Sequence, residues 1–158
     1  MIHSNIITGK DVELGDSSSL NNVDLGDRVT IGEHCTIFGS EKNILTIGEG
    51  SVVGSRSILN GYSAKLSIGK RCSIGSFCHF IVDTGPTASE YLLKKYPILE
   101  APISVGDDCI IGHGSMVIAG VSIGDCVLVH PKSFVNSDIP SYSIVAGSPA
   151  KVIGKIEK

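Results

Sequence analysis

Two histidines stand where their side chains could act on a hydroxyl group. His79 directly precedes a long interruption in an otherwise regular pattern of aliphatic residues, and His113 follows soon after the pattern resumes. A neutral imidazole, with an ordinary pKa near ~6.5, can take a proton from a hydroxyl as its oxygen attacks an electrophile. Desolvation at a subunit contact would lower the pKa of His79 and keep its ring neutral. These two residues are therefore the candidate catalytic groups.

The pattern that positions them is an aliphatic residue at every sixth position. Most of these residues are followed directly by glycine, and a small or β-branched residue comes four positions after most of them. The aliphatic positions are Leu25, Ile31, Ile37, Ile47, Val53, Leu59, Ile68, Ile74, Phe80, Val105, Ile111, Val117, Ile123, Val129 and Val135. A six-residue unit of strand and turn cannot bury its apolar side alone, whereas stacked units can.

Three interruptions indicate how the units form a coil. The six-residue count slips by four residues after Ile37, by three after Leu59 and by nineteen after Phe80, each time after a third hexad. Insertions are tolerated where loops leave a scaffold, so all three should leave one corner of a triangular coil.

The sequence thus predicts one all-β domain over residues 1–158. It is a parallel β-helix, a triangular prism of about five coils built from hexapeptide repeats. An extended loop is expected at about 82–103 and a short C-terminal cap at about 140–158. The residues before Leu25 are expected to form a ragged first coil.

One wall of this prism is predicted to be apolar on its outer side. Side chains alternate along a strand, so residues beside each inward aliphatic residue point outward. On the wall of Ile37 these are Phe38, Ile58, Ile81, Met116, Ile118 and Phe134, whereas another wall carries Asp24, Thr46, Ser67, Ser104 and Ser122. Exposed apolar surface usually marks an interface, and packing about a three-fold axis would close it. We therefore expect a homotrimer, with His79 at the edge of its apolar wall.

Composition argues against several other classes of protein. The net charge is −3, and lysines and arginines are scattered singly, whereas a nucleic-acid partner requires clustered basic residues. No apolar run approaches the ~20 residues of a membrane span. The N-terminus also lacks the features of a signal peptide, so we expect a cytoplasmic protein.

The cysteines are predicted to fill the core. Cys35, Cys72, Cys78 and Cys109 all occupy the small inward position of a hexad, and Cys126 lies at a turn. Their spacing matches no metal-binding pair, and a cytosolic setting disfavours disulfides. They should act as compact hydrophobes.

Two stretches carry a resemblance to a known family. "VGDDCIIGHGSMVIAGVSIGDC" and "DIPSYSIVAGSPAKVIGKI" resemble the left-handed β-helix hexapeptide-repeat acyltransferases, most closely the sugar and xenobiotic O-acetyltransferases. The resemblance implies left-handed coils, a parallel homotrimer and active sites between neighbouring subunits. It implies acetyl-CoA as co-substrate, no metal, and transfer of an acyl group to a saccharide hydroxyl, plausibly in surface-polysaccharide biosynthesis.

The resemblance also assigns roles to residues. It implies that the coenzyme lies along Gly112, Gly114, Ser115, Ala119, Gly120, Ala146, Gly147 and Lys151. Asp83 and Thr84 are expected to contact the saccharide. The family's catalytic histidine in the long loop is replaced here by Gly85, and its lysine before "DIP" by Ser137. The base is then His79 or His113, unless a neighbouring subunit supplies it or the chain does not catalyse the transfer.

Two alternatives stay open. One is a CoA-binding or scaffolding trimer without turnover, which would explain Gly85. The other is a metal enzyme like the γ-class carbonic anhydrases, which needs three histidines around zinc. His113 would supply the first of these, but the partner expected five residues on is Ile118.

Overall fold

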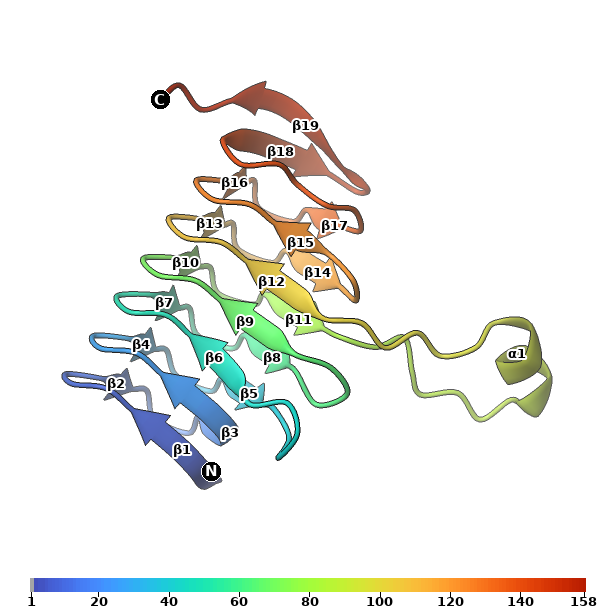
Figure 1. Cartoon of the computed structure of the whole chain (residues 1–158), viewed down its shortest axis with the longest axis horizontal. Coiled ribbons are helices and arrows are strands. Elements are labelled where there is room, and N and C mark those ends of the chain that lie inside the picture. Colours follow the sequence, from blue (N-terminus) through green and yellow to red (C-terminus); the bar gives the residue numbers. More distant parts are fainter. Residues whose placement is uncertain (1) are drawn as a thin grey trace.

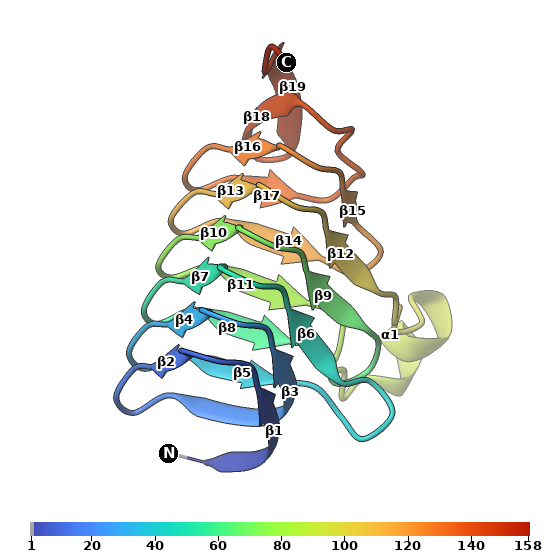
Figure 2. The ribbon, with the colours of Figure 1, turned by 60° about the vertical axis from the view of Figure 1, so that its left-hand side comes forward.

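The computed structural model describes residues 2–158 as a column of triangular coils from which one long segment projects (Figure 1). The coils form the left-handed parallel β-helix expected for hexapeptide repeats, with about six turns. Three walls run along the column, here called A, B and C, and Figure 2 shows them around it.

Wall A consists of β1 (His3–Thr8), the second half of β3 (Ser19–Leu25), β6 (Leu45–Ile47), β9 (Leu66–Ile68), β12 (Ile103–Val105) and β15 (Ser122–Ile123). Wall B consists of β2 (Glu13–Leu14), β4 (Thr30–Ile31), β7 (Val52–Val53), β10 (Ser73–Ile74), β13 (Ile110–Ile111), β16 (Leu128–Val129) and β18 (Ser143–Gly147). Wall C consists of the first half of β3, β5 (Thr36–Phe38), β8 (Ile58–Asn60), β11 (His79–Ile81), β14 (Met116–Ile118) and β17 (Phe134–Val135). Strands within each of these walls pair in parallel.

The predicted core is confirmed. Every aliphatic residue of the six-residue pattern points inward, and the least buried of them, Val105, is only 4% exposed. Phe80, the largest fully buried side chain, fills the coil that carries His79. Burying one such side chain stabilises the fold by roughly 1.5–3 kcal/mol, so the repeat itself drives the stacking of coils.

Glycine recurs after the inward residue because the next coil passes very close. A Cβ atom added to Gly112 would lie 2.4 Å from the backbone nitrogen of Pro131, and one added to Gly75 would lie 2.6 Å from that of His113. His130 occupies the corresponding position in the last full coil, above which β18 turns back into a hairpin. This explains why a histidine is accommodated there.

The small inward positions form a ladder of hydrogen bonds between coils. The Ser57 hydroxyl donates to the carbonyl of Gly75 at 2.9 Å and accepts from the backbone N–H of Cys78 at 3.1 Å. The Cys78 thiol in turn lies 3.3 Å from the carbonyl of Gly112. Burial raises the pKa of the Cys35 and Cys78 thiols, which keeps them protonated. Four cysteines are buried and all five are free, which confirms their role as core filler.

Both ends of the column are more regular than predicted. The expected ragged first coil is instead a complete coil of β1, β2 and the first half of β3, so about six coils are present rather than five. Leu20 is fully buried in it, whereas Leu14 is 36% exposed at the open end. At the other end, Ile139 bridges Ile123 and β18 continues wall B, so part of the predicted cap is still coil. Only β19 (Ala150–Lys155) turns back antiparallel.

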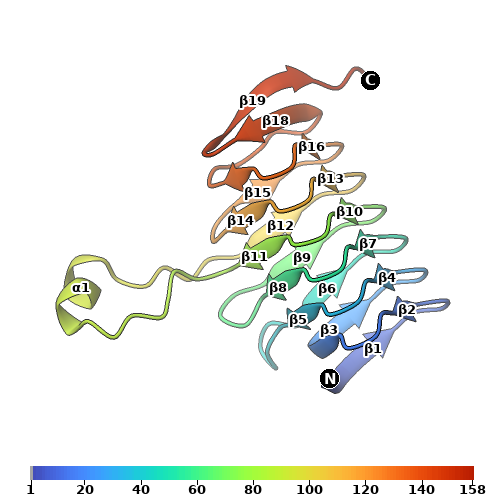
Figure 3. The same cartoon turned by 180° about the vertical axis from the view of Figure 1, so that it is seen from behind.

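All three insertions leave the corner between walls C and A, as predicted. They follow β5, β8 and β11, the three strands of wall C that precede them. The longest, residues 83–102, is here called the arm, and Figures 1 and 3 show it projecting away from the coils. Its base is a short ribbon in which the N–H of Ala101 donates to the carbonyl of Val82 at 2.9 Å.

The tip of the arm is α1 (Glu90–Lys95). Its N-cap is Ser89, whose hydroxyl accepts a hydrogen bond from the N–H of Leu92 at 3.1 Å. No residue of α1 is buried, and Tyr91 and Tyr96 are 70% and 77% exposed. Within residues 2–158, no helix is long and apolar enough to cross a membrane.

Candidate active site

His79 lies on wall C and points outward, as its place beside inward Phe80 requires. In the register of the sheet it stands between Ile58 of β8 and Met116 of β14. These apolar neighbours leave the ring half-buried, and desolvation lowers the pKa of His79 below its ordinary value. The imidazole is therefore neutral near neutral pH, the form that a general base requires.

His113 lies at the corner between walls B and C, one coil above Ser76. Its Nδ1 accepts a hydrogen bond from the backbone N–H of Ser76 at 2.8 Å. An acceptor nitrogen carries no proton, so the ring N–H is assigned to Nε2. His113 is thus arranged to donate a hydrogen bond through Nε2 rather than to accept a proton.

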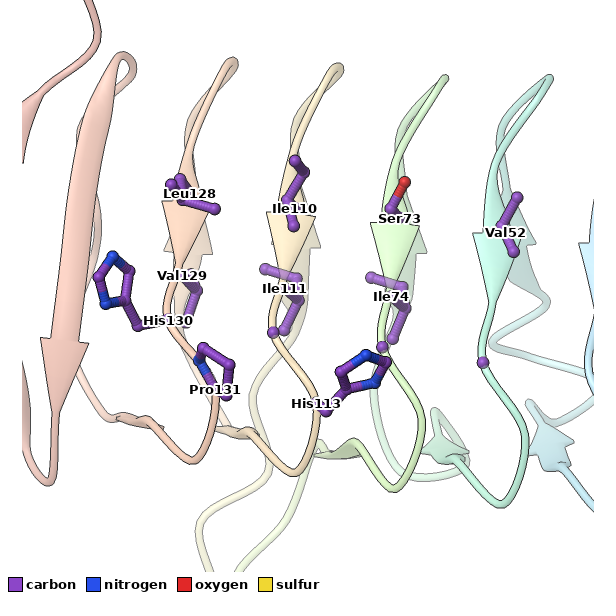
Figure 4. A pocket seen from close by; sticks show the side chains of 13 residues that line it. Val52, Ser73, Ile74, Ile110, Ile111, His113, Leu128, Val129, His130 and Pro131 are labelled. Atoms are coloured by element: carbon purple, nitrogen blue, oxygen red, sulfur yellow. The ribbon is translucent and has the colours of Figure 1, made fainter.

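Wall B carries a groove that the sequence analysis did not single out (Figure 4). Its volume is about 550 Å³, and its floor includes the outward side chains of Val52, Ile110 and Leu128. Val52 and Ile110 are 42% and 51% exposed, so wall B presents apolar surface as well as wall C. His113 and His130 line the side of this groove toward the corner. The expectation of a single apolar wall is therefore corrected to two adjoining ones.

The two candidate histidines line different surfaces of one chain. His79 belongs to wall C, whereas His113 borders the groove of wall B. In Figure 4 the His113 ring lies beside Ile74 of the preceding coil, and His130 points the other way.

The residues expected to hold the coenzyme divide between two corners. Gly112 and Gly114 lie at the corner between walls B and C, and the Ala146–Gly147 end of β18 follows the same side of wall B. Ala119 and Gly120 lie instead at the corner between walls C and A, where the N–H of Gly120 donates to the carbonyl of Pro102 at 3.2 Å. The three-residue strand β14 separates the two groups.

The two remaining residues of the expected set are Ser115, just before β14, and Lys151, on β19. The Ser115 hydroxyl points inward and donates to the carbonyl of His130 at 3.1 Å, so it faces no ligand. Lys151 is exposed on β19, opposite Ala146.

Asp83 and Thr84, the expected saccharide contacts, form the base of the arm. The Asp83 carboxylate accepts from the Ser63 hydroxyl at 3.1 Å and from the N–H of Gly85 at 3.0 Å. The Thr84 hydroxyl accepts from the N–H of Leu99 at 2.9 Å. Asp83 borders a surface hollow, whereas the Thr84 hydroxyl joins the two strands of the arm.

Sequence reasoning did not identify two hollows at the corner between walls C and A, an outer one lined by polar side chains and an inner one of mixed lining. They adjoin one another, share Ser63 and Glu100, and are formed by the three insertions. The signal was present, because insertions that all follow a third hexad must stack on one corner. For metals, residues 2–158 contain no group of three or more His, Cys, Asp or Glu side chains that could hold an ion.

Comparisons with known proteins agree with this architecture. Residues 102–137 match the family model "Bacterial transferase hexapeptide (six repeats)". A probable acetyltransferase of Mycobacterium tuberculosis is 31% identical over 150 residues, which are 94% of this chain and 49% of that protein. The chain spans about half the length of the curated relatives it matches.

Solved structures show the same fold. AntD, an N-acyltransferase from Bacillus cereus in complex with dTDP and 3-hydroxybutyryl-CoA, superposes with a TM-score of 0.84 at 22% identity, over 97% of this chain and 84% of its own. The polySia-specific acetyltransferase NeuO superposes with a TM-score of 0.68 at 21% identity, over 98% and 70%. Residues 102–137 thus carry the hexapeptide repeat of bacterial transferases, and the described chain has the left-handed β-helix fold that such repeats form.

Proposed function

We propose that this protein is a CoA-dependent acyltransferase that uses His79 to transfer an acyl group to a hydroxyl of a saccharide. The observation that carries the proposal is the half-buried, neutral imidazole of His79 on the wall beside the arm. The acetyltransferase names of its relatives and the acyl-CoA in AntD support the choice of donor. The saccharide acceptor is supported by the sugar substrate named for NeuO and by the polar side chains that line the outer hollow at the corner next to wall C.

The chemistry of His79 follows from its protonation state. The neutral ring takes the proton of the acceptor hydroxyl while the oxygen forms a bond to the carbonyl carbon of the thioester. The carbon–sulfur bond then breaks, and His79 returns the proton to the departing thiolate. The coenzyme supplies the acyl thioester, and the His113 Nε2–H is the side-chain donor suited to charge developing on the carbonyl oxygen.

The positions of the expected coenzyme residues favour a site built between neighbouring copies of the chain. Gly112 and Gly114 offer backbone without side chains at one corner, whereas Ala119 and Gly120 lie at another. A ring of copies needs two different patches on each chain, and walls B and C are adjoining apolar patches. We expect a homotrimer in which wall C of one copy faces the groove of wall B on the next. This arrangement would bring His79 opposite the His113 of a neighbouring copy.

The exposed apolar and aromatic residues of the arm support the same assembly. Tyr91, Leu92 and Tyr96 are all exposed, so the rest of the described chain does not bury them. Exposed apolar side chains on a projecting segment usually mark a contact with another molecule. A neighbouring copy is the partner that a three-fold ring supplies.

The direct test is transfer from acetyl-CoA to a panel of sugars, read by release of the CoA thiol and by mass spectrometry of the acceptor. Neutral sugars and their amino analogues are compared, because AntD is an N-acyltransferase and transfer to an amine must be distinguished from transfer to a hydroxyl. We expect transfer to hydroxyls that is strongly lowered in His79→Ala and preserved in His34→Ala, since His34 is exposed on a different coil. If only amines are acylated, the acceptor group is an amine and not a hydroxyl. If no sugar of the panel is acylated, the proposal is overturned.

A second candidate is a trimer that binds CoA without turnover. Gly85, where the family has its catalytic histidine, favours it. In the structure the N–H of Gly85 is bound to Asp83, so this position serves the fold of the arm. Calorimetric binding of CoA to a protein that releases no thiol with any acceptor would select this candidate.

A further inference from the structure

The loops at the corner between walls C and A form an outer polar hollow of about 580 Å³. It is built by the short insertions after β5 and β8 together with the end of the arm. Apart from the ring of Tyr62, every lining side chain is a hydrogen-bonding or charged group, and among them are Asn22, Ser40, Asn43 and Ser63. The Tyr62 side chain is 61% exposed and free to present its ring face.

This combination of groups suits a sugar. A pyranose presents several hydroxyls that both donate and accept hydrogen bonds, and amides and serine hydroxyls match both roles. Its C–H face is apolar and packs against an aromatic ring such as that of Tyr62. Binding sites generally combine a few convergent polar groups with an apolar or aromatic surface in this way.

The hollow is held in shape without a ligand. The backbones of Ser40 and Asn43 exchange two hydrogen bonds of 2.9 and 3.1 Å, which close the first loop. The Asn43 amide donates to the carbonyl of Tyr62 at 3.2 Å, and the N–H of Tyr62 donates to the Asn60 side chain at 3.1 Å. The loops of two successive coils are thus tied together. A preorganised site binds more tightly because less ordering is needed on binding.

The hollow is continuous with the surface that carries His79. The inner hollow, of about 370 Å³, shares Ser63 and Glu100 with the outer one and reaches Asn60, Ile81 and Asp83. Asn60 and Ile81 are register partners on wall C, and Ile81 is two residues beyond His79, about 7 Å along the strand. A chain of sugars whose first residue reacts at His79 would therefore extend through Asn60 toward Tyr62.

The charges of the two hollows select among saccharides. The carboxylates of Glu41, Asp83 and Glu100 line them, against the single ammonium group of Lys42. The ammonium group of Lys65, in the insertion after β8, donates to the carbonyl of Ile44. This excess of negative charge would repel an acidic sugar or a nucleotide diphosphate, whereas a neutral sugar carries no charge to be repelled.

We infer that this corner is the binding site for the second and later sugars of the acceptor, so that the preferred acceptor is a neutral oligosaccharide rather than a monosaccharide or an anionic sugar. The inference rests on the proposed acyltransferase function. It assigns substrate length and charge to residues outside the catalytic pair, chiefly Tyr62, Asn43 and Asn60.

The test compares acyl transfer from acetyl-CoA to a neutral monosaccharide, its tetrasaccharide and an acidic tetrasaccharide. The neutral tetrasaccharide should have the highest kcat/KM. In Tyr62→Ala its KM should rise about 3- to 10-fold, the effect of losing one aromatic contact. The kcat and the rate on the monosaccharide should stay unchanged, and Tyr62→Phe, which keeps the ring, should retain most of the preference.

Three results would overturn the inference and leave the acyltransferase proposal standing. The first is equal kcat/KM for the neutral monosaccharide and the neutral tetrasaccharide, and the second is a higher kcat/KM for the acidic tetrasaccharide. The third is an equal effect of Tyr62→Ala on all acceptors. If nothing is acylated, the acyltransferase proposal fails instead. Calorimetric binding of the same tetrasaccharides to wild type and Tyr62→Ala then decides the inference alone. Binding of the neutral tetrasaccharide that Tyr62→Ala weakens supports it, and no such binding rejects it.

Discussion

The Nδ1 atom of His113 accepts a hydrogen bond from the backbone N–H of Ser76 at 2.8 Å. This contact joins two coils at the corner between walls B and C and commits the lone pair of Nδ1. His79, by contrast, is surrounded by Ile58 and Met116 and has its pKa lowered by desolvation alone. The two histidines therefore have different chemistry, which divides the roles of base and hydrogen-bond donor between them.

Replacing His79 tests the assignment of the base. His79→Ala should lower turnover with acetyl-CoA by ~10²–10⁴-fold, the usual range for loss of a general base. Trimer content and CoA binding should remain near wild type, since the side chain points outward. His113→Ala should have the smaller effect. If His113→Ala abolishes turnover and His79→Ala does not, the two roles are reversed.

The pH dependence of kcat/KM reports the same group. A base works in its unprotonated form, so kcat/KM should rise with pH and level off above the pKa of His79. Because desolvation lowers that pKa, the midpoint should lie below the ordinary ~6.5 of histidine. Residual activity of His79→Ala should lack this rise. A midpoint above the ordinary value would mean that a carboxylate partner, rather than burial, dominates the site.

Introducing charge on wall C should disrupt the assembly. Ile58 is 39% exposed in the single chain and lies beside His79, so Ile58→Glu would place a carboxylate in the proposed contact between copies. Light scattering should show a shift from trimer to smaller species. The matched control is Thr46→Glu on polar wall A, which should leave the trimer intact. If both variants keep the mass of the wild-type trimer, wall C does not form the interface.

The closeness of successive coils predicts the cost of a single methyl group. Gly112→Ala would place a Cβ atom 2.4 Å from the backbone nitrogen of Pro131, and only a backbone shift can relieve this. Overpacking of this kind costs about 1–3 kcal/mol in the free energy of unfolding. Gly154→Ala is the control, because its Cβ would meet only a side-chain atom of Ile144 at 3.5 Å. Denaturant unfolding curves of the two variants should separate clearly.

Exchanging cysteine for serine tests the role of the thiols. The small inward position just before each strand of wall C holds Cys35, Ser57, Cys78 and Ser115 in successive coils. The thiols and the hydroxyls both form hydrogen bonds to carbonyls of the next coil. Cys78→Ser should therefore change the free energy of unfolding by less than about 1.5 kcal/mol, the range of one hydrogen bond, and leave turnover unchanged. Loss of turnover in a correctly folded Cys78→Ser protein would show a chemical role for this thiol.

Much of this protein could be predicted from local sequence because a solenoid repeats one local rule. Inward and outward directions alternate along each short strand, so the hexad count alone placed Phe80 inside, His79 outside and the three insertions on one corner. The small slots that Cys35 and Cys78 occupy follow from the same count. The first coil was the exception, since Leu20 lies five rather than six residues before Leu25 and the coil is completed by β1, which lies outside the pattern.

The stacking of coils decided the rest. Ser76 and His113 are 37 residues apart because the arm separates their coils, and only the closed column brings them to 2.8 Å. The same stacking divided the expected coenzyme residues between two corners and assembled Asn43, Tyr62 and Asp83 from three separate insertions. These contacts depend on the rise and the lateral register of successive coils. The sequence of a single hexad does not determine either quantity, because both are set when the coils pack around one common core.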